Sequence, residues 1–341
     1  MLSAVLGLFS QDLAVDLGTA HTRLWLRGQG VVLDEPTLLA VHTDPRGRRR
    51  VLAVGAEARP MLERAPKDIQ LVRPVRDGHV HDFEAAEAYL LHLVRRVHGR
   101  NGWMSPRMVV TVPPSITDIE RRAVRESCEA AGAREVHLVS RPLAAALGCD
   151  LPVDQPSGHL VVDLGAGSTE ITVLSMRGVV TSDTVPGGGD AMDDAVVAWV
   201  RDQHQLLVGR PTAEAVKIRL GDAVAGRSGE AAVAGRCLER HIPRAVTLGS
   251  PEVRAALAPS IGAIAERIRG ALERTPPELL SDILDNGVIL TGGGSRLRGL
   301  DVALRDLTGL PVVAADPEAR AVITGAGRVL EDPGMVRALA A

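Results

Sequence analysis

The chain has 341 residues, enough for about two domains, and its formal net charge of −3 gives no general reason to expect nucleic-acid binding. Its residues are 45% hydrophobic but only 2% aromatic, so the core must consist of Leu, Val, Ala and Ile, as in buried parallel strands and helices. The three cysteines are odd in number and far apart, so neither a disulfide framework nor a zinc site follows from them, and a reducing compartment fits.

The chain starts with an apolar segment, Met1 to Phe9. It lacks the basic start and long apolar region of a signal peptide, and no apolar run in the sequence reaches the roughly 20 residues of a membrane span. A short, mostly hydrophobic helix here would be a weak membrane-surface anchor. Because the segment has no Lys or Arg to attract anionic lipid, a disordered or packed tail is the other interpretation.

Three short apolar runs then open an α/β domain. We predict antiparallel strands over Leu13–Asp16, Thr22–Leu26 and Val31–Leu33. Between the first two lies Asp16-Leu17-Gly18-Thr19, an acid at a strand end followed by a glycine and a hydroxyl. Residues 34–74 indicate a small inserted subdomain. Within it we expect a strand and a short helix, over Val51–Val54 and Glu57–Arg64.

Helices and strands alternate through the rest of the first half, which predicts a parallel sheet with helices on both faces. In order, we expect a helix over Phe83–His98, a strand over Met108–Val112, a helix from Thr117 to near Gly132, a strand over Val136–Val139 and a helix over Leu143–Leu147. Thr117 and Glu120 form a capping box. Residues 151–158, rich in Pro and Asp, indicate the boundary between domains over 1–150 and 151–341.

Trp103 and Met104 are large apolar residues in a loop flanked by Gly and Pro. A loop tip is usually exposed and basic residues lie nearby, so insertion into a membrane surface is one interpretation. The other is that the two side chains cover an edge of the core. The sequence favours neither.

The second half repeats the plan of the first. We expect strands over Leu160–Asp163, Glu170–Ser175, Val179–Val185 and Gly287–Leu290, and helices over Ala191–Leu207, Thr212–Leu220, Pro251–Ala258, Ser260–Arg274 and Pro276–Leu284. Residues 190–258 indicate a second inserted subdomain, in which 223–249 has little pattern. A C-terminal helix over about 319–332 is expected to return to the first domain.

The second half also holds a near copy of the first acid-and-glycine motif, Asp163-Leu164-Gly165-Ala166-Gly167-Ser168-Thr169. Two such elements indicate a duplicated fold whose halves present a turn to one ligand. Glycines let backbone N–H groups approach an anion, and the hydroxyls of Thr19, Ser168 and Thr169 add donors. Asp16 and Asp163 would repel phosphate unless a hydrated Mg²⁺ lay between them.

A third glycine turn, Thr291-Gly292-Gly293-Gly294-Ser295, follows the last expected strand of the second half. Its glycines would let backbone pass close to a flat or anionic ligand. In the helix over 212–220, Glu214 and Lys217 lie on one face, which by itself indicates a routine surface ion pair.

Together these motifs resemble the actin and heat-shock-chaperone ATPase superfamily and, within it, the MreB family of bacterial actins, which direct cell-wall growth. The likeness rests on both Asp–Gly turns, on Glu214 with Lys217 and on the glycine turn at 292–294. It covers nearly the whole chain, through Val32–Pro36, Arg73–Gly78, Pro142–Ala146, Gly188–Asp193, Glu273–Leu279 and Leu297–Asp301.

The resemblance implies an actin-like α/β fold: two duplicated ribonuclease-H-like domains with small inserted subdomains around a nucleotide cleft. It implies ATP and Mg²⁺ as cofactors, with Asp16 and Asp163 holding the metal through water. Glu214 and Lys217 would hold the ribose or adenine edge, and 292–295 would close over the nucleoside. The residues implied at the nucleotide are Asp16, Gly18, Thr19, Ala20, His21, Asp163, Gly165, Ala166, Gly167, Ser168, Thr169, Glu214, Lys217, Gly292, Gly293, Gly294 and Ser295.

The resemblance also implies partners: further copies of the chain in a filament, the inner face of the cytoplasmic membrane and the cell-wall elongation machinery, but no nucleic acid. Co-assembly with another MreB paralogue stays open. The protein would be cytoplasmic and peripheral to the membrane. The residues implied at the membrane are Leu2, Val5, Leu6, Leu8, Phe9, Trp103 and Met104.

The sequence departs from the family where hydrolysis is concerned. In MreB proteins the strand before Pro-Leu-Ala-Ala-Ala ends in two glutamates, one of which orients the attacking water, and these places hold Ser140 and Arg141 here. Neither a hydroxyl nor a guanidinium is a general base near neutral pH. Ala166 replaces a glycine, Ser168 a threonine and His21 an asparagine. We expect nucleotide binding with weak or lost hydrolysis. A compensating residue elsewhere, such as Asp163, is not visible in the sequence.

Two other classes of protein remain open. A non-polymerising nucleotide-gated binding or scaffold protein would need a separate client-binding domain, and the sequence indicates none. A sugar kinase on the same fold would need a sugar-facing acid in a large inserted pocket, and the sequence offers no candidate insert. Pelleting with ATP would distinguish a filament from the non-polymerising scaffold protein, and phosphorylation of an added sugar would support the sugar kinase.

Overall fold

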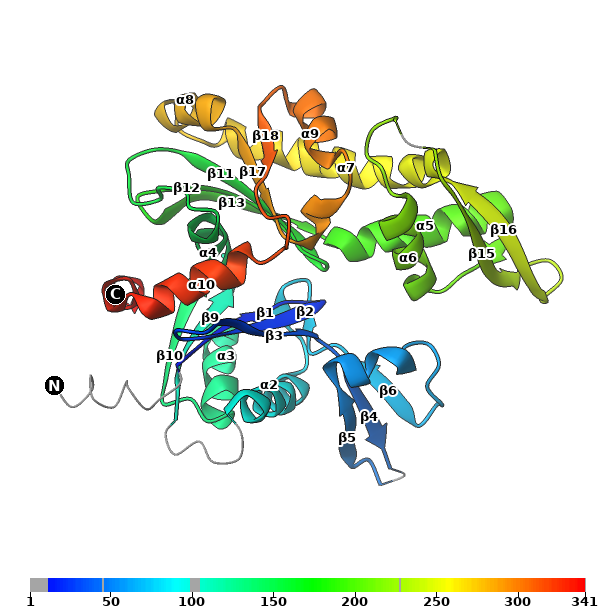
Figure 1. Cartoon of the computed structure of the whole chain (residues 1–341), viewed down its shortest axis with the longest axis horizontal. Coiled ribbons are helices and arrows are strands. Elements are labelled where there is room, and N and C mark those ends of the chain that lie inside the picture. Colours follow the sequence, from blue (N-terminus) through cyan, green and yellow to red (C-terminus); the bar gives the residue numbers. More distant parts are fainter. Residues whose placement is uncertain (1–11, 45, 99–104, 227, 341) are drawn as a thin grey trace. The chain divides into compact units, whose positions relative to one another are not determined.

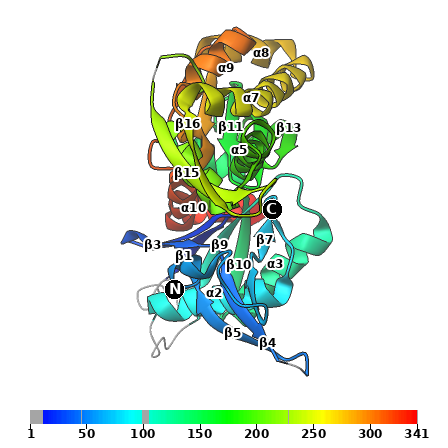
Figure 2. The same cartoon turned by 90° about the vertical axis from the view of Figure 1, so that its right-hand side faces the viewer.

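The computed structural model describes residues 12–44, 46–98, 105–226 and 228–340. The chain forms two compact units, unit 1 over Met1–Asp154 with Arg320–Ala341 and unit 2 over Gln155–Ala319. Two views drawn at right angles show their elements (Figure 1, Figure 2). The residues predicted at the membrane, in 2–9 and at 103–104, lie outside the described residues. Within the described ranges, none of the helices is long and apolar enough to cross a membrane.

Unit 1 is built on a five-stranded sheet with the order β10-β9-β1-β2-β3 (Figure 1). Its strands are β1 Leu13–Leu17, β2 His21–Leu26, β3 Gly30–Pro36, β9 Arg107–Val112 and β10 Glu135–Ser140. The predicted antiparallel opening is confirmed, and β1, β9 and β10 run parallel. All five residues of β1 are buried, as expected for an apolar run covered on both faces. The carboxyl ends of the three parallel strands therefore lie at one edge of the sheet.

Five helices are described in unit 1: α2 Phe83–His98, α3 Asp118–Ala130, α4 Arg141–Gly148, α10 Ala321–Glu331 and α11 Pro333–Ala340. The capping box of Thr117 and Glu120 at the start of α3 is confirmed. Helix α10 packs closely against α4, and glycines permit the approach. A Cβ atom on Gly325 would overlap the carbonyl oxygen of Ala144, and one on Gly148 would overlap that of Ala321.

A small sheet with the order β5-β4-β6 forms the insertion of unit 1, from β4 Leu39–Thr43, β5 Arg49–Val54 and β6 Ile69–Val72. A hairpin of β7 Val75–Arg76 and β8 His79–Val80 follows. The helix predicted over 57–64 is wrong, because two 3-10 turns, Gly55–Glu57 and Arg59–Met61, lie there instead. Pro60 has no N–H to donate to an α-helical bond, and the N–H groups of Met61 and Leu62 bond three residues back.

Unit 2 repeats the main sheet of unit 1. Its order is β13-β12-β11-β17-β18, in which β12 pairs antiparallel with both β11 and β13, and β11, β17 and β18 run parallel. The strands are β11 His159–Leu164, β12 Ser168–Ser175, β13 Gly178–Pro186, β17 Val288–Thr291 and β18 Val312–Ala314. The central strands, β1 of unit 1 and β11 of unit 2, each lead into a turn with an acid, a glycine and a hydroxyl residue. The duplication inferred from the sequence therefore has a structural counterpart.

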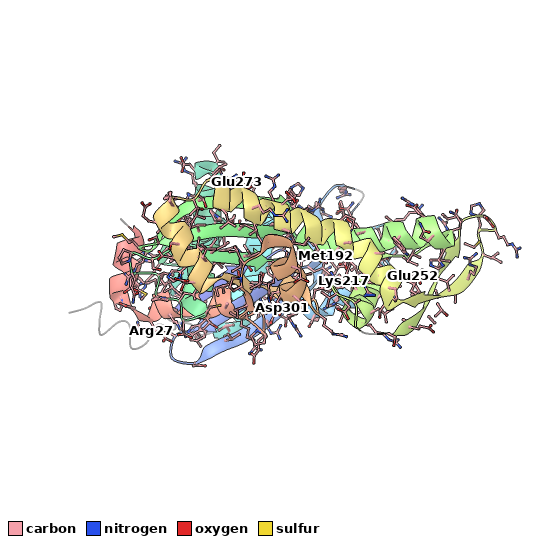
Figure 3. The ribbon with its side chains drawn as sticks, turned by 90° about the horizontal axis from the view of Figure 1, so that it is seen from above. Arg27, Met192, Lys217, Glu252, Glu273 and Asp301 are labelled. Carbon is pink, nitrogen blue, oxygen red and sulfur yellow. The ribbon has the colours of Figure 1, made fainter. Side chains whose placement is uncertain are left out.

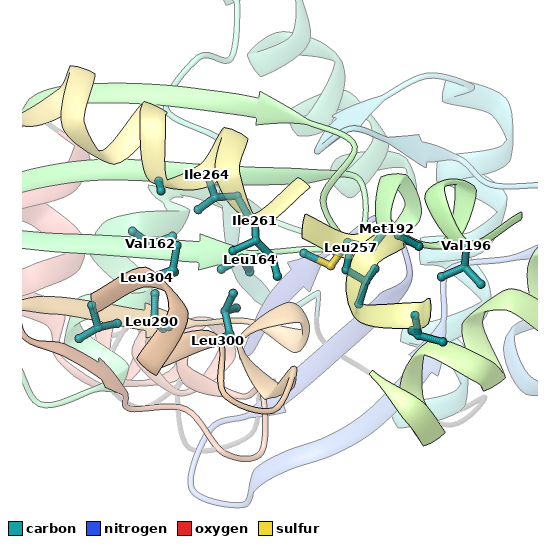
Figure 4. Close-up of a cluster of buried hydrophobic side chains, with 14 of the residues drawn as sticks. Val162, Leu164, Met192, Val196, Leu257, Ile261, Ile264, Leu290, Leu300 and Leu304 are labelled. Atoms are coloured by element: carbon teal, nitrogen blue, oxygen red, sulfur yellow. The ribbon is translucent and has the colours of Figure 1, made fainter. Parts of the chain in front are cut away.

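The core of unit 2 joins this sheet to its helices, which are α5 Gly188–His204, α6 Arg210–Leu220, α7 Ser250–Glu273, α8 Pro277–Asn286 and α9 Leu300–Thr308. Leu257, Ile261 and Ile264 of α7 pack with Val162 and Leu290 of the strands (Figure 4). Helix α7 is continuous, so the predicted break at Pro259 is wrong. Burial of apolar residues on both sides of the proline outweighs the loss of about 3 kcal/mol that an interior proline causes.

A second small sheet, β14-β15-β16, was not predicted. It consists of β14 Leu206–Leu207, β15 Glu230–Cys237 and β16 Pro243–Gly249. The sequence signal of β15 is weak because its buried positions include the small residues Ala231 and Cys237. Helix α5 also differs from its prediction: it begins at Gly188, ends at His204 and is followed by Gln205 in the left-handed region, at φ 51°.

Candidate functional site

The first glycine turn joins β1 to β2 in unit 1. The N–H of Gly18 donates to the carbonyl oxygen of His21 at 3.1 Å, and a Cβ on Gly18 would overlap that oxygen. Thr19 is buried, and its Oγ1 accepts a hydrogen bond from the N–H of Gly78 at 3.1 Å. Since a hydroxyl can accept and donate at once, Thr19 keeps a proton with which to meet an anion.

Asp16, at the end of β1, is a buried carboxylate with several partners in unit 1. Thr111 Oγ1 donates to its Oδ1 at 2.9 Å, and Arg141 Nη1 forms an ion pair with the same oxygen. Arg23 Nη1 lies 3.9 Å from Oδ2. The topology explains the cluster, because β1, β9 and β10 are neighbouring parallel strands and Asp16, Thr111 and Arg141 follow their shared edge.

This cluster does not fit the hydrated Mg²⁺ that the sequence predicts at Asp16. A metal held through water needs the negative charge of the carboxylate, and here a guanidinium already pairs with it. Within the described ranges, no three His, Cys, Asp or Glu side chains gather in a way that could hold a metal ion. The role of Asp163 toward Mg²⁺ stays a prediction.

His21 follows the turn and contacts Asp34 on β3. Its Nδ1 lies 2.8 Å from Asp34 Oδ1, and Arg23 Nε donates to Asp34 Oδ2 at 3.0 Å. Burial would raise the pKa of Asp34, but the hydrogen bond to His21 and the charge and hydrogen bond of Arg23 outweigh it and lower the pKa to about 2. With Nδ1 engaged in this way, Nε2 is the atom of His21 that can serve a ligand.

Ser140 and Arg141 lie at the junction of β10 and α4. Ser140 occupies the N-cap of α4 without making a side-chain cap bond, and its Oγ is buried without a hydrogen-bond partner among the described residues. Arg141 is the first residue of the helix and its side chain is 14% exposed. The junction therefore contributes a hydroxyl and a cation, and neither takes a proton from water near neutral pH.

The second glycine turn, between β11 and β12 in unit 2, is held by the start of α5. The N–H groups of Gly187, Gly189 and Asp190 donate to the carbonyl oxygens of Gly167, Gly165 and Ala166, at 2.5, 3.0 and 2.8 Å. Gly188 has φ 37°, and a Cβ there would overlap the Gly165 carbonyl oxygen. The carbonyls of the turn are fixed toward α5, and the N–H of Gly165 donates to the carbonyl oxygen of Ser168 at 2.9 Å. An anion at this turn would therefore be met by the N–H groups of Ala166 and Gly167.

The third glycine turn lies against the second within unit 2. Thr291 Oγ1 donates to Asp163 Oδ1 at 3.3 Å, and Gly292, at φ 81°, has no room for a Cβ beside that carboxylate. The N–H of Gly292 donates to Asp316 at 3.2 Å, and Ser295 Oγ donates to the Gly292 carbonyl at 2.7 Å. The structure thus brings Asp163 and 292–295 together, as parallel pairing of β11 with β17 requires.

Lys217, which the sequence places on one face of α6 with Glu214, contacts α5. Its Nζ lies 2.7 Å from Asp193 Oδ1 and donates to the carbonyl oxygen of Gly189 at 2.8 Å. Its side chain is 16% exposed, and it lies on α6 beside the part of α5 that carries Met192 (Figure 3). Lys217 thereby ties α6 to the glycine run that holds the second turn.

Asp193 is a residue that the sequence prediction missed. Burial raises its pKa to about 6, against the opposing charge and hydrogen bond of Lys217, and the nearby charges of Glu214 and Asp190 add to the rise. The signal that could have found it is its place one helical turn after the glycine run 187–189, on the α5 face toward Lys217.

We expect the carboxyl group of Asp193 to titrate near pH 6. Its pKa in the folded chain lies above the ordinary 3.8, so the folded state binds this proton more tightly, and the contribution to the free energy of unfolding falls as pH rises from about 4 to about 6. Carbon-13 NMR of the carboxyl groups measures the midpoint, and an Asp193→Asn variant assigns the signal. A midpoint near 4 would mean that Lys217 outweighs burial.

A sequence profile of the MreB/Mbl protein family matches residues 10–338. The chain belongs to the MreB/Mbl family. It is 45% identical to the cell shape-determining protein MreB of Escherichia coli (strain K12) over 335 residues, which cover 97% of this chain and 96% of that protein. It is 39% identical to the cell shape-determining protein Mbl of Bacillus subtilis (strain 168) over 326 residues, covering 95% and 97%.

Solved structures of MreB relatives have the same fold. The crystal structure of MreB5 of Spiroplasma citri bound to AMPPNP matches with a TM-score of 0.89 at 31% identity, over 94% of this chain and 96% of that one. The MamK double helical filament matches with a TM-score of 0.77 at 24% identity, over 95% and 99%, which is a likeness of fold alone. The predicted family and the predicted actin-like α/β fold are confirmed.

Proposed function

We propose that this MreB/Mbl-family chain binds ATP at its glycine turns, assembles into filaments at the inner face of the cytoplasmic membrane and helps to set cell shape, with slow hydrolysis. The observation that carries the proposal is the repeated turn of β1–β2 and β11–β12, each closed by a backbone hydrogen bond, from Gly18 to His21 and from Gly165 to Ser168. Such turns present N–H groups and hydroxyls to an anion.

Nucleotide binding has support from both units separately. In unit 1, Thr19 offers a hydroxyl, and Arg23 lies near the same turn. In unit 2, the second and third turns lie side by side, with Lys217 and Glu214 on the neighbouring α6. The MreB5 relatives of Spiroplasma citri were crystallised with AMPPNP and with ADP, which favours the same ligand class here.

Filament formation and the role in cell shape rest on the family relationship. The relatives named above are cell shape-determining proteins, and they match over nearly the whole chain. Subunits that associate head to tail through two different surfaces form an open filament. Association with the membrane and with the wall-elongation machinery is the finer part of the proposal, and it depends on the apolar residues of 2–9 and on Trp103 and Met104.

Slow hydrolysis follows from the junction of β10 and α4. A positioned general base typically contributes about 10² to 10⁴ in rate. Ser140 and Arg141 supply none, and Asp16 on the same sheet edge is paired with Arg141. An ATP-bound state would therefore be long-lived, and partners would control assembly.

The test measures ATP binding, phosphate release and high-speed sedimentation on one purified sample. We expect ATP to bind, phosphate release to stay near background, the protein to pellet with ATP, and added liposomes to raise the pelleted fraction, because self-assembly multiplies weak membrane contacts. Binding without pelleting would indicate a nucleotide-gated scaffold instead. Rapid release would contradict the role assigned to Ser140 and Arg141, and an unchanged pellet with liposomes would contradict the membrane part.

A further inference from the structure

Arg141 and Asp16 form a largely buried ion pair at the edge of the unit 1 sheet. The exposed fractions of their side chains are 14% and 3%. Burying one partner without the other would strongly destabilise unit 1, because an uncompensated charge in a protein interior is unfavourable. The two residues are 125 positions apart, and the parallel arrangement of β1, β9 and β10 brings them to one edge of the sheet.

Four charged side chains near the first glycine turn, two of each sign, balance each other. Asp16 and Asp34 are the carboxylates, and Arg23 and Arg141 are the guanidiniums paired with them. Thr111 adds a neutral donor to Asp16. A divalent cation is drawn to a site with net negative charge, and these four side chains together have none.

The same balance suits a polyphosphate. A guanidinium has five N–H donors in a planar fork, so one face of Arg141 can pair with a carboxylate while another meets a phosphate oxygen. Arg141 is also the first residue of α4, where the partial positive charge of the helix dipole favours an anion. The Thr19 hydroxyl and the N–H groups of Thr19 and Ala20 belong to the same unit, whereas the N–H of Gly18 is already bonded to the carbonyl oxygen of His21.

We propose that Arg141 is the resident cation beside the first glycine turn of unit 1, so that the chain binds the phosphates of ATP without needing a divalent metal. The proposal deepens the proposed function and rests on nucleotide binding there. Arg141 holds Asp16 in a neutral pair and supplies to the phosphate tail positive charge that a metal would otherwise bring.

The test titrates wild-type full-length protein with a fluorescent ATP analogue, once with excess Mg²⁺ and once with EDTA. We expect the two dissociation constants to agree within about threefold. In Arg141→Glu, which reverses the charge beside Asp16, we expect binding in EDTA to be at least about tenfold weaker than in Mg²⁺, because close like charges repel the phosphates unless a cation screens them. Arg50→Glu, at an exposed position of β5, is the matched control and should behave as wild type.

The outcomes separate this inference from the function on which it rests. Wild-type binding that is lost in EDTA but present with Mg²⁺ would overturn the resident-cation proposal and leave nucleotide binding intact. If the dissociation constant of Arg141→Glu changes as little between Mg²⁺ and EDTA as that of wild type, the assignment to Arg141 is overturned. No binding by wild type in either buffer would overturn both proposals. If Arg141→Glu does not fold, the comparison of wild-type binding in Mg²⁺ and in EDTA still tests the proposal. Arg141→Gln then replaces Arg141→Glu as the variant.

Discussion

Replacing Gly325 by alanine is expected to destabilise unit 1 by about 3 kcal/mol, because overpacking against fixed backbone cannot be relieved by a side-chain movement. The added Cβ would overlap the carbonyl oxygen of Ala144, so α10 and α4 would have to move apart. Their separation would also loosen Ile323 and Val329, which α10 buries in unit 1. Calorimetry should show a melting temperature lower by roughly 5–10 °C for the transition of this unit.

The matched control is Gly262→Ala in α7, where an added Cβ would have no neighbour within 4 Å. Alanine is the better helix former, so the same substitution there should stabilise the chain, by up to about 1 kcal/mol. If the same Gly→Ala change lowers the melting temperature at 325 and raises it at 262, the contact between α10 and α4 is the cause of the loss. Equal melting temperatures for wild type and Gly325→Ala would show that α10 is not held at this distance.

Restoring carboxylates at the β10–α4 junction should produce the largest gain in activity. We expect the double variant Ser140→Glu/Arg141→Glu, assayed in excess Mg²⁺, to release phosphate from ATP about 10²-fold faster than wild type, within the range that a general base contributes. The measurement is phosphate release under saturating ATP, so that a change in affinity does not enter the rate.

The control for this gain is Ser140→Gln/Arg141→Gln, which has side chains of the same size that cannot accept a proton from water. It should stay near the wild-type rate. If the Gln variant releases phosphate as fast as the Glu variant, the gain comes from the loss of the Arg141–Asp16 pair and not from a general base. No gain in either variant would mean that another residue limits hydrolysis.

Much of the fold could be predicted because its signals are local. The strands that end at Asp16 and Asp163 are unbroken apolar runs followed by an acid and glycine, and both are central strands of their sheets. The failures have non-local causes. Helix α7 runs through Pro259 because residues distant in sequence bury its two halves, and β15 alternates small residues whose pairing with β16 decides the strand.

The candidate site divides in the same way. The glycine turns could be found from residue type and order, since close approach of backbone leaves room for nothing larger at Gly18, Gly188 and Gly292. The pairing of Arg141 with Asp16 could not be found, because it depends on the register of three parallel strands. The same holds for Lys217 with Asp193, which required the relative placement of α5 and α6.

The return of the last helices to unit 1 determines when that unit can be completed during synthesis. Residues 155–319 are continuous and can fold once they have left the ribosome, whereas unit 1 lacks α10 until all of unit 2 has been synthesised. At 5–20 residues per second, its first 154 residues wait roughly ten to thirty seconds for that helix. Through this interval the sheet surface that α10 covers stays exposed, so a nascent chain of this protein offers an apolar surface to chaperones until α10 has left the ribosome.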